Sequence, residues 1–132
     1  MPSADQLARQ WPLIEPLLKK ATQRWYAYEP IDVLARILAG HPLGLWTVVE
    51  DTKLVAVIVT EIRQYPRCRS LEVLFVAGQG NAVKRWYEPV LEALDRQAEA
   101  AGCNDIVAFG RRGWARMGFE ITGATLLRRV RG

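Results

Sequence analysis

The sequence predicts an α/β domain in which helices cover both faces of one mixed sheet, and three observations support this. Segments with helical periodicity alternate along the chain with short apolar runs of strand-like composition. In 53–63 both alternating faces are apolar, so both faces of that strand must be covered. Apolar runs at 71–76 and 105–109 enclose a long amphipathic segment, which implies a right-handed parallel crossover. A three-layer arrangement of helices, sheet and helices follows.

The first expected helix covers 3–28, where apolar residues recur at helical spacing. Ser3 or Asp5 can cap its start with a side-chain oxygen. Pro12 and Pro16 each remove a backbone donor, so we expect the helix to start near Pro12 or to bend there.

A second, shorter helix and a tight hairpin are expected next. Pro30 suits the first position of a helix, and Gly40 suits its end. Two strands, 45–50 and 53–63, then flank Asp51-Thr52, and this spacing is typical of a tight β-hairpin.

The second half of the chain continues the alternation of strands and helices. The strand 71–76 leads through a glycine-rich turn into an amphipathic helix that Asn81 can cap and Gly102 can end. A short buried strand at 105–109 follows. The last expected elements are a short helix at 111–117 and a strand at 119–130.

Size and composition indicate a single domain over residues 1–132. Hydrophobic residues make up 50% of the chain, which is enough to build a core without disulfides or metal ions. Cys68 and Cys103 have neither CxxC spacing nor a histidine cluster beside them, so we expect no metal site and no disulfide framework. No segment has the build of a signal peptide or the length of a membrane span, so we expect a cytoplasmic protein without membrane contact.

The formal net charge is +4, and positive charge is concentrated in the last part of the sequence. Between 111 and 131 a single acid, Glu120, accompanies six arginines, which are Arg111, Arg112, Arg116, Arg128, Arg129 and Arg131. Such a segment can attract nucleic acid, an acidic partner or a phosphorylated cofactor. Because no nucleic-acid motif accompanies it, we favour a solvated basic surface over nucleic-acid binding.

The turn Gly78-Gln79-Gly80 before the long helix is a candidate anion site. Backbone N–H groups at a helix start lack intrahelical partners, and together with the helix dipole they favour a phosphate or pyrophosphate. The same glycines would equally serve a tight turn that needs positive φ, so their spacing leaves both interpretations open.

Two acids lie inside otherwise apolar strands and are candidate general bases. Glu61 is expected to share a strand face with Val57 and Val59, and Glu72 to share one with Leu74 and Val76. A carboxylate among apolar neighbours can take a proton from a substrate. The alternative is that each acid forms a structural ion pair with one of the nearby arginines, which are Arg63, Arg67 and Arg69.

Three segments together resemble the Gcn5-related N-acetyltransferase superfamily: LWTVVEDTKLVAVIVTEI, then LEVLFVAGQG, then DIVAFGRRGWARMGFE. They cover about residues 44–130. The resemblance implies a six-stranded mixed sheet preceded by two helices, and a splay between the strands at 71–76 and 105–109 that admits acetyl-CoA. The runs WPLIEPLLKKAT and GRRGWARMGFE further resemble small acetyltransferase-like proteins of tailed phages and prophages.

The resemblance also implies roles for individual residues. It favours Glu72 over Glu61 as the base that deprotonates the acceptor amine. The backbone of Leu74, Phe75 and Val76 would offer donors to the acetyl carbonyl and the pantetheine arm. The pyrophosphate would be held by the backbone of Gly78, Gly80, Asn81 and Ala82, with Lys84 or Arg85 neutralising a nearby phosphate.

Two positions depart from the family pattern. The cofactor loop of the family begins with Gln or Arg where this chain has Ala77. Trp114 stands where many members place a tyrosine that protonates the departing thiolate, and tryptophan has no comparable proton to give.

The function expected from these observations is that of an acetyl-CoA-dependent N-acyltransferase whose acceptor is an amine. The alternative is a catalytically inactive acetyltransferase-like fold that serves as a phage-encoded structural or protein-binding module, in the cytoplasm or in the virion. A homodimer or an assembly with phage proteins is left open by the sequence.

Overall fold

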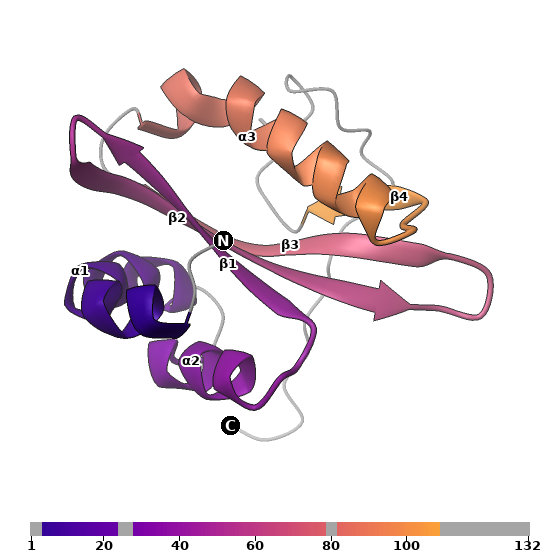
Figure 1. Cartoon of the computed structure of the whole chain (residues 1–132), viewed down its shortest axis with the longest axis horizontal. Coiled ribbons are helices and arrows are strands. Elements are labelled where there is room, and N and C mark those ends of the chain that lie inside the picture. Colours follow the sequence, from indigo (N-terminus) through magenta and orange to yellow (C-terminus); the bar gives the residue numbers. More distant parts are fainter. Residues whose placement is uncertain (1–3, 24–27, 79–81, 109–132) are drawn as a thin grey trace, which may run out of the picture.

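The computed structural model describes residues 4–23, 28–78 and 82–108. These residues form three helices, α1 (Ala4–Thr22), α2 (Pro30–Leu38) and α3 (Ala82–Ala100). They also form one sheet of four strands in the order β1 (Leu43–Glu50), β2 (Lys53–Gln64), β3 (Arg69–Gly78) and β4 (Asp105–Ala108). Figure 1 shows α1 and α2 on one face of the sheet and α3 on the other. The predicted three-layer arrangement is therefore confirmed for this part of the chain.

The first helix, α1, runs without a break through both of its prolines. The prediction that it starts near Pro12 is wrong, and it ends at Thr22 rather than at 28. Leu7, a full turn before Pro12, is only 2% exposed and anchors the start of the helix in the core. Pro12 and Pro16 both lie on the exposed side, where water can bind the carbonyls that lose their intrahelical donors.

The second helix, α2, has defined signals at both ends. Its first residue is Pro30, and the Asp32 carboxylate accepts a hydrogen bond from the backbone N–H of Glu29 at 2.8 Å. Such a contact satisfies a donor that the helix itself cannot pair. After Leu38 the chain turns at Gly40, whose φ of 82° lies in the left-handed region that glycine adopts without strain.

The first three strands form an antiparallel meander, as expected from the sequence. The β1–β2 turn is the predicted Asp51-Thr52 pair, and both residues have positive φ, 50° and 65°. Residues 55–61 of β2 are all buried, because helices cover both faces of that strand. The strands are longer than expected, and β2 and β3 project past the end of α3 as a hairpin (Figure 1).

An extra residue interrupts the ladder between β2 and β3. Val59 pairs with Phe75 and Thr60 pairs with Val73, so Leu74 has no register partner and forms a bulge. The bulge resets the alternation of β3, so Leu74 and Phe75 both belong to the core beneath α1 and α2. Val76 instead packs in the cluster beneath α3. The prediction that Val76 shares a face with Glu72 is therefore wrong.

Two apolar clusters lie on opposite sides of the sheet. The cluster beneath α1 and α2 includes Ile14, Leu18, Val57 and Phe75. The cluster beneath α3 includes Ile58, Leu71, Val73 and Leu94, with Trp46 and Val76 packed against it. Both faces of the sheet therefore contribute to a hydrophobic core. A polar side chain in the buried part of the sheet needs a hydrogen-bond or ion-pair partner close by.

The strand β4 adds to the edge of β3 in parallel, which confirms the predicted strand–helix–strand crossover. The pairing runs from Ser70 opposite Asp105 to Val73 opposite Ala108. At the start of this pairing, the Ser70 hydroxyl donates a hydrogen bond to the Asp105 carboxylate at 2.5 Å.

Several predicted elements lie outside the described residues. These are the helix at 111–117, the strand at 119–130 and Trp114, as well as any sixth strand. Among the described helices, none combines the length and the apolar character needed to cross a lipid bilayer.

Candidate active site

The two candidate bases are cross-strand neighbours on the same face of the sheet. Glu61 on β2 and Glu72 on β3 are register partners, and their side chains are only 9% and 4% exposed. Glu61 continues the face of Val57 and Val59, as predicted, so both carboxylates point to the side covered by α1 and α2. The fold therefore brings two buried acids together at one place.

One arginine reaches both acids. The Arg63 Nε atom lies 2.5 Å from Glu61 Oε1 and 3.4 Å from Glu72 Oε2. Arg63 is two residues beyond Glu61 on the same strand, so its side chain leaves the same face of β2. Its hydrogen bond to Glu61 and the negative charge of Glu61 raise the pKa of Arg63 further above its ordinary value. The structural ion pair that the sequence offered as the alternative is thus present for both acids.

The second oxygen of each carboxylate has a different neighbour. Glu61 Oε2 is 4.0 Å from Arg36 Nη1 on α2. Glu72 Oε1 accepts a hydrogen bond from the phenol of Tyr65, which lies just beyond β2. This hydrogen bond is the main reason that the pKa of Tyr65 is raised. Glu61 therefore faces two guanidinium groups, whereas Glu72 faces one guanidinium and one neutral hydroxyl.

Sequence reasoning did not identify Arg36 and Tyr65 as members of this cluster. Arg36 reaches it only because α2 packs on this face of the sheet. Tyr65 reaches it because the hairpin folds its ring back toward a residue seven positions later in the chain. Neither contact leaves a short-range sequence pattern.

The predicted coenzyme end of β3 lies beyond the bulge. Within the described residues, 75–78 pair with β2 and Leu74 is the bulge residue, while the last described pair with β4 is that of Val73 with Ala108. The side chains of Leu74 and Phe75 are buried in the core beneath α1 and α2. The described part of β4 ends at Ala108, so the splay beside Val76 stays a prediction.

The start of α3 follows Gly78 after three residues. Gly80 and Asn81 lie outside the described residues, as do the side chains of Ala82 and Lys84. The first turn of α3 contains no acidic residue. A helix start without an acid is compatible with a bound anion.

Arg85 already has a partner in the structure. Its Nη2 atom is 3.0 Å from Glu50 Oε2, and the Trp86 indole N–H is 3.5 Å from the same oxygen. The contact ties the end of β1 to the first turns of α3 at the surface. A phosphate would therefore compete with Glu50 for Arg85, and the phosphate role of Arg85 stays a prediction.

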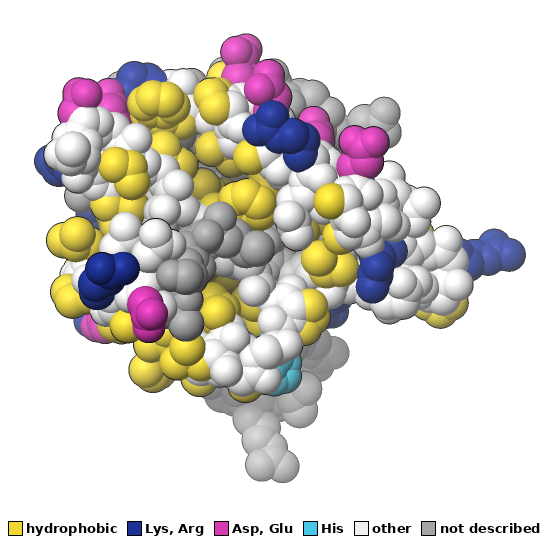
Figure 2. All heavy atoms as spheres, in the orientation of Figure 1, with side chains coloured by type: hydrophobic (Ala, Val, Ile, Leu, Met, Phe, Trp, Pro, Cys, Tyr) yellow, Lys and Arg dark blue, Asp and Glu magenta, His cyan; other side chains and the backbone are white. Residues whose placement is uncertain are grey.

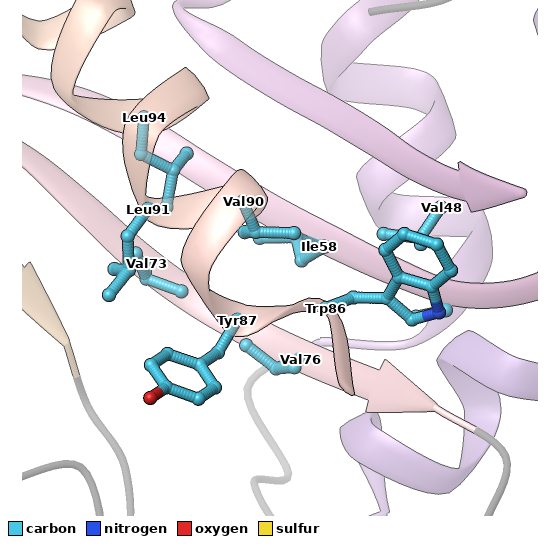
Figure 3. Close-up of a pocket in the computed structure, with 10 residues that line it drawn as sticks. Val48, Ile58, Val73, Val76, Trp86, Tyr87, Val90, Leu91 and Leu94 are labelled. Carbon is cyan, nitrogen blue, oxygen red and sulfur yellow. The ribbon is translucent and has the colours of Figure 1, made fainter. Parts of the chain in front are cut away.

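A small cavity lies between α3 and the sheet (Figure 3). Figure 3 shows Val90 pointing toward Ile58 and Trp86 lying beside Val48. The cavity volume is about 30 Å³, which is room on the scale of a water molecule. Since its lining is made of apolar side chains, it is a packing gap beneath α3 and not a coenzyme site.

A larger hollow lies on the face of the sheet that α3 covers, near the C-terminal part of α3. It has a volume of about 140 Å³ and is bordered by the starts of β1 and β3, by the end of β2 and by Gln97 of α3. At its wall the Trp46 indole N–H donates to the Thr60 hydroxyl at 3.1 Å. The two candidate bases lie on the opposite face of the sheet, so this hollow does not contain them.

The molecular surface in Figure 2 has the orientation of Figure 1. Basic side chains gather on the protruding end formed by the β2–β3 hairpin.

Across the part of the chain that the structure describes, no group of three or more His, Cys, Asp or Glu side chains is arranged to hold a metal ion.

The fold matches solved acetyltransferases. An aminoglycoside N-acetyltransferase, AAC(6')-Iy, solved in complex with CoA, is 16% identical with a TM-score of 0.71 over 95% of this chain and 91% of its own. A protein from Clostridium acetobutylicum described as a predicted acetyltransferase, solved with acetyl-CoA, is 14% identical with a TM-score of 0.69 over 92% and 91%. Ribosomal-protein-alanine N-acetyltransferase from Brucella melitensis biovar Abortus is 17% identical with a TM-score of 0.68 over 92% and 94%.

These likenesses show that the chain has the fold of the GNAT acetyltransferases. Neither a protein-family model nor a curated protein sequence matches the chain.

Proposed function

We propose that this protein is an acetyl-CoA-dependent N-acyltransferase that acts on a primary amine. The observation that carries the proposal is the position of Glu72. This buried carboxylate is paired with Val107 of β4, one residue before Val73, which is the last residue of β3 with a described partner on β4, and two before the bulge at Leu74. If the strands splay beside Val76, as the resemblance implies, a base at this position is suited to an acceptor amine that meets a thioester in the splay.

The residues at the end of β3 fit the coenzyme. In the predicted splay, backbone groups of 74–78 would bind an extended pantetheine arm, and N–H groups at the start of α3 would bind the pyrophosphate. When bound, acetyl-CoA supplies an activated acyl group on a thiol leaving group. The contribution of this chain is to align the amine with that group and to remove a proton from the amine.

Glu72 is the better candidate for the base. Both oxygens of Glu61 face guanidinium groups, of Arg63 at 2.5 Å and of Arg36 at 4.0 Å. Glu72 is 3.4 Å from Arg63 and otherwise bonded to the neutral phenol of Tyr65. A hydroxyl can rotate and leave the carboxylate oxygen free to accept a proton, whereas both oxygens of Glu61 face guanidinium groups that have only donors. We assign Glu61 the role of holding Arg63 in place.

A non-catalytic role as a binding module is the competing function. The ion pairs of both acids with Arg63, and of Arg85 with Glu50, are the observations in its favour. Under this alternative the charged residues only stabilise the fold, and the chain recognises a protein partner.

The test is turnover of acetyl-CoA with a panel of primary amines, measured as released thiol, together with thermal unfolding in the presence of the coenzyme. At a concentration of about 100 times the dissociation constant, the ligand should stabilise the folded state by roughly 2.7 kcal/mol. Lys84→Glu places a negative charge in the first turn of α3 and should weaken coenzyme binding.

The matched control is Glu99→Gln, an exposed acid near the far end of α3, which should behave like the parent. If millimolar acetyl-CoA neither stabilises the protein nor is consumed with any amine, the non-catalytic alternative replaces the proposal.

A further inference from the structure

We propose that Tyr65 is a positioning residue that carries the proton taken up by Glu72 out to solvent. The proposal rests on the function proposed above, with Glu72 as the base. It gives a role to a residue at the edge of the acid pair that neither the sequence nor the fold assigns.

Acylation of an amine requires such a route. The nitrogen of an ammonium acceptor loses two protons when it becomes an amide. One of them is taken by the leaving thiol, so a second proton must reach solvent in every turnover. The Glu72 side chain is only 4% exposed, so a proton held there has little direct contact with water.

The phenol of Tyr65 connects Glu72 to the surface. It donates a hydrogen bond to Glu72 Oε1, while Tyr65 as a residue is 39% exposed. The turn holds its backbone in place, because the Tyr65 N–H donates to the Cys68 carbonyl at 2.8 Å. The Gln64 side-chain amide also donates to the Tyr65 carbonyl at 2.8 Å.

The transfer balances without any other group. After Glu72 has taken up a proton, the Tyr65 hydroxyl rotates toward solvent. Glu72 then donates its proton to the phenol oxygen as the phenol gives its own proton to a water molecule. The O–H formed in this way already points to Glu72, so the carboxylate and the phenol are back in their starting forms. No net charge stays in the core.

The other neighbours of Glu72 cannot serve this purpose. Arg63 of β2 contacts the second oxygen of Glu72, but it stays protonated because the adjacent Glu61 raises its pKa further. Arg36 of α2 contacts Glu61 and not Glu72 among the ion pairs of the described residues. The phenol of Tyr65 is thus the neutral group that can both accept and donate a proton here.

The test compares Tyr65→Phe with Tyr87→Phe. Tyr87 also donates to a carboxylate, that of Glu88 at 3.4 Å, but on the exposed surface of α3. We expect Tyr65→Phe to lower kcat about tenfold or more while leaving KM for acetyl-CoA within about twofold of the parent. Tyr87→Phe should leave both values at the level of the parent.

A pH profile and a buffer titration separate a proton route from a merely structural role. Adding a small tertiary-amine buffer, which cannot be acylated, should raise kcat of Tyr65→Phe with buffer concentration but leave the parent unchanged. The kcat of Tyr65→Phe should also depend more steeply on pH than that of the parent, since solvent must then reach Glu72 directly.

A spectroscopic readout does not depend on activity. The difference between the ultraviolet titrations of the parent and Tyr65→Phe isolates the ionisation of the Tyr65 phenol. Its pKa should lie above the ordinary value of about 10 in the parent and should fall toward that value in Glu72→Gln.

The outcomes are distinguishable. If the parent turns over amines and Tyr65→Phe has the same kcat, the proton route is overturned, but the proposed function is not. An unchanged Tyr65 titration in Glu72→Gln overturns the contact itself. A parent that neither binds nor consumes acetyl-CoA overturns the proposed function, and the proton route with it.

Discussion

Glu61 and Glu72 lie directly opposite each other on neighbouring antiparallel strands, and the Arg63 guanidinium reaches both carboxylates. Two like charges in that position repel, and their burial removes the water that would screen them. The cluster is stable because Arg63 and Arg36 supply positive charge and Tyr65 supplies a hydrogen bond. The same groups therefore maintain the fold and define the chemistry of the proposed site.

Removal of the shared cation should destabilise the protein. Arg63→Met keeps most of the side-chain length but leaves two buried carboxylates without their common partner. We expect a loss of about 1–2 kcal/mol, less than for a fully buried pair because the Arg63 side chain is 52% exposed. Urea unfolding at neutral pH measures this loss. Arg67→Met, at the exposed hairpin tip, is the control, and an equal effect of both changes would contradict the bridging role of Arg63.

The two acids should differ in their effect on turnover. Glu72→Gln removes the proposed base and should lower kcat about 100-fold. Glu61→Gln removes only the neighbour that holds Arg63, so we expect a decrease of less than about tenfold. Steady-state kinetics with a saturating amine measures both values. A larger decrease in kcat for Glu61→Gln than for Glu72→Gln would mean that Glu61 is the base and Glu72 its neighbour.

The β1–β2 turn offers a stabilising change. Thr52 adopts a φ of 65°, which is strained for a β-branched residue. Thr52→Gly creates an Asp-Gly pair, a preferred sequence for a tight hairpin, and should raise the free energy of unfolding by about 0.5–1 kcal/mol. The control is Thr47→Gly within β1, which should lower stability. A loss of stability in Thr52→Gly, measured by urea unfolding, would show that its side chain is needed.

The Tyr65–Glu72 contact predicts a specific pH dependence of stability. Because the pKa of Tyr65 is raised in the folded state, its contribution to stability is fully present below the ordinary tyrosine pKa of about 10. That contribution is lost as the pH rises through the higher folded value. Unfolding free energies of the parent and Tyr65→Phe should therefore differ at pH 7 and converge at pH values well above 10. A difference that stays constant over this range would exclude the linkage.

The parts of the fold that local patterns determine could be predicted from the sequence. The spacing of two residues, Asp51-Thr52, between the strand-like runs 45–50 and 53–63 identifies the hairpin, and the amphipathic segment before 105–109 identifies the parallel crossover. The continuous α1 was not predictable from its prolines, because the burial of Leu7 depends on the tertiary core.

Prediction of the site was limited by strand register. Glu61 and Glu72 were identified as buried acids from their apolar neighbours, but nothing local indicates that they lie opposite each other. The bulge at Leu74, which turns Val76 to the other face, also arises from the pairing of two strands and not from either strand alone.

The central claim is that acetyl-CoA binds along the end of β3 and the start of α3. The most direct test is titration of ¹⁵N-labelled protein with acetyl-CoA, with amide chemical shifts followed residue by residue. Binding should move the amides of Leu74–Gly78 and of the first turn of α3, and leave those of Leu43–Thr47 at the far edge of the sheet in place. The absence of shifts at millimolar coenzyme, or shifts confined to β1, would contradict the account.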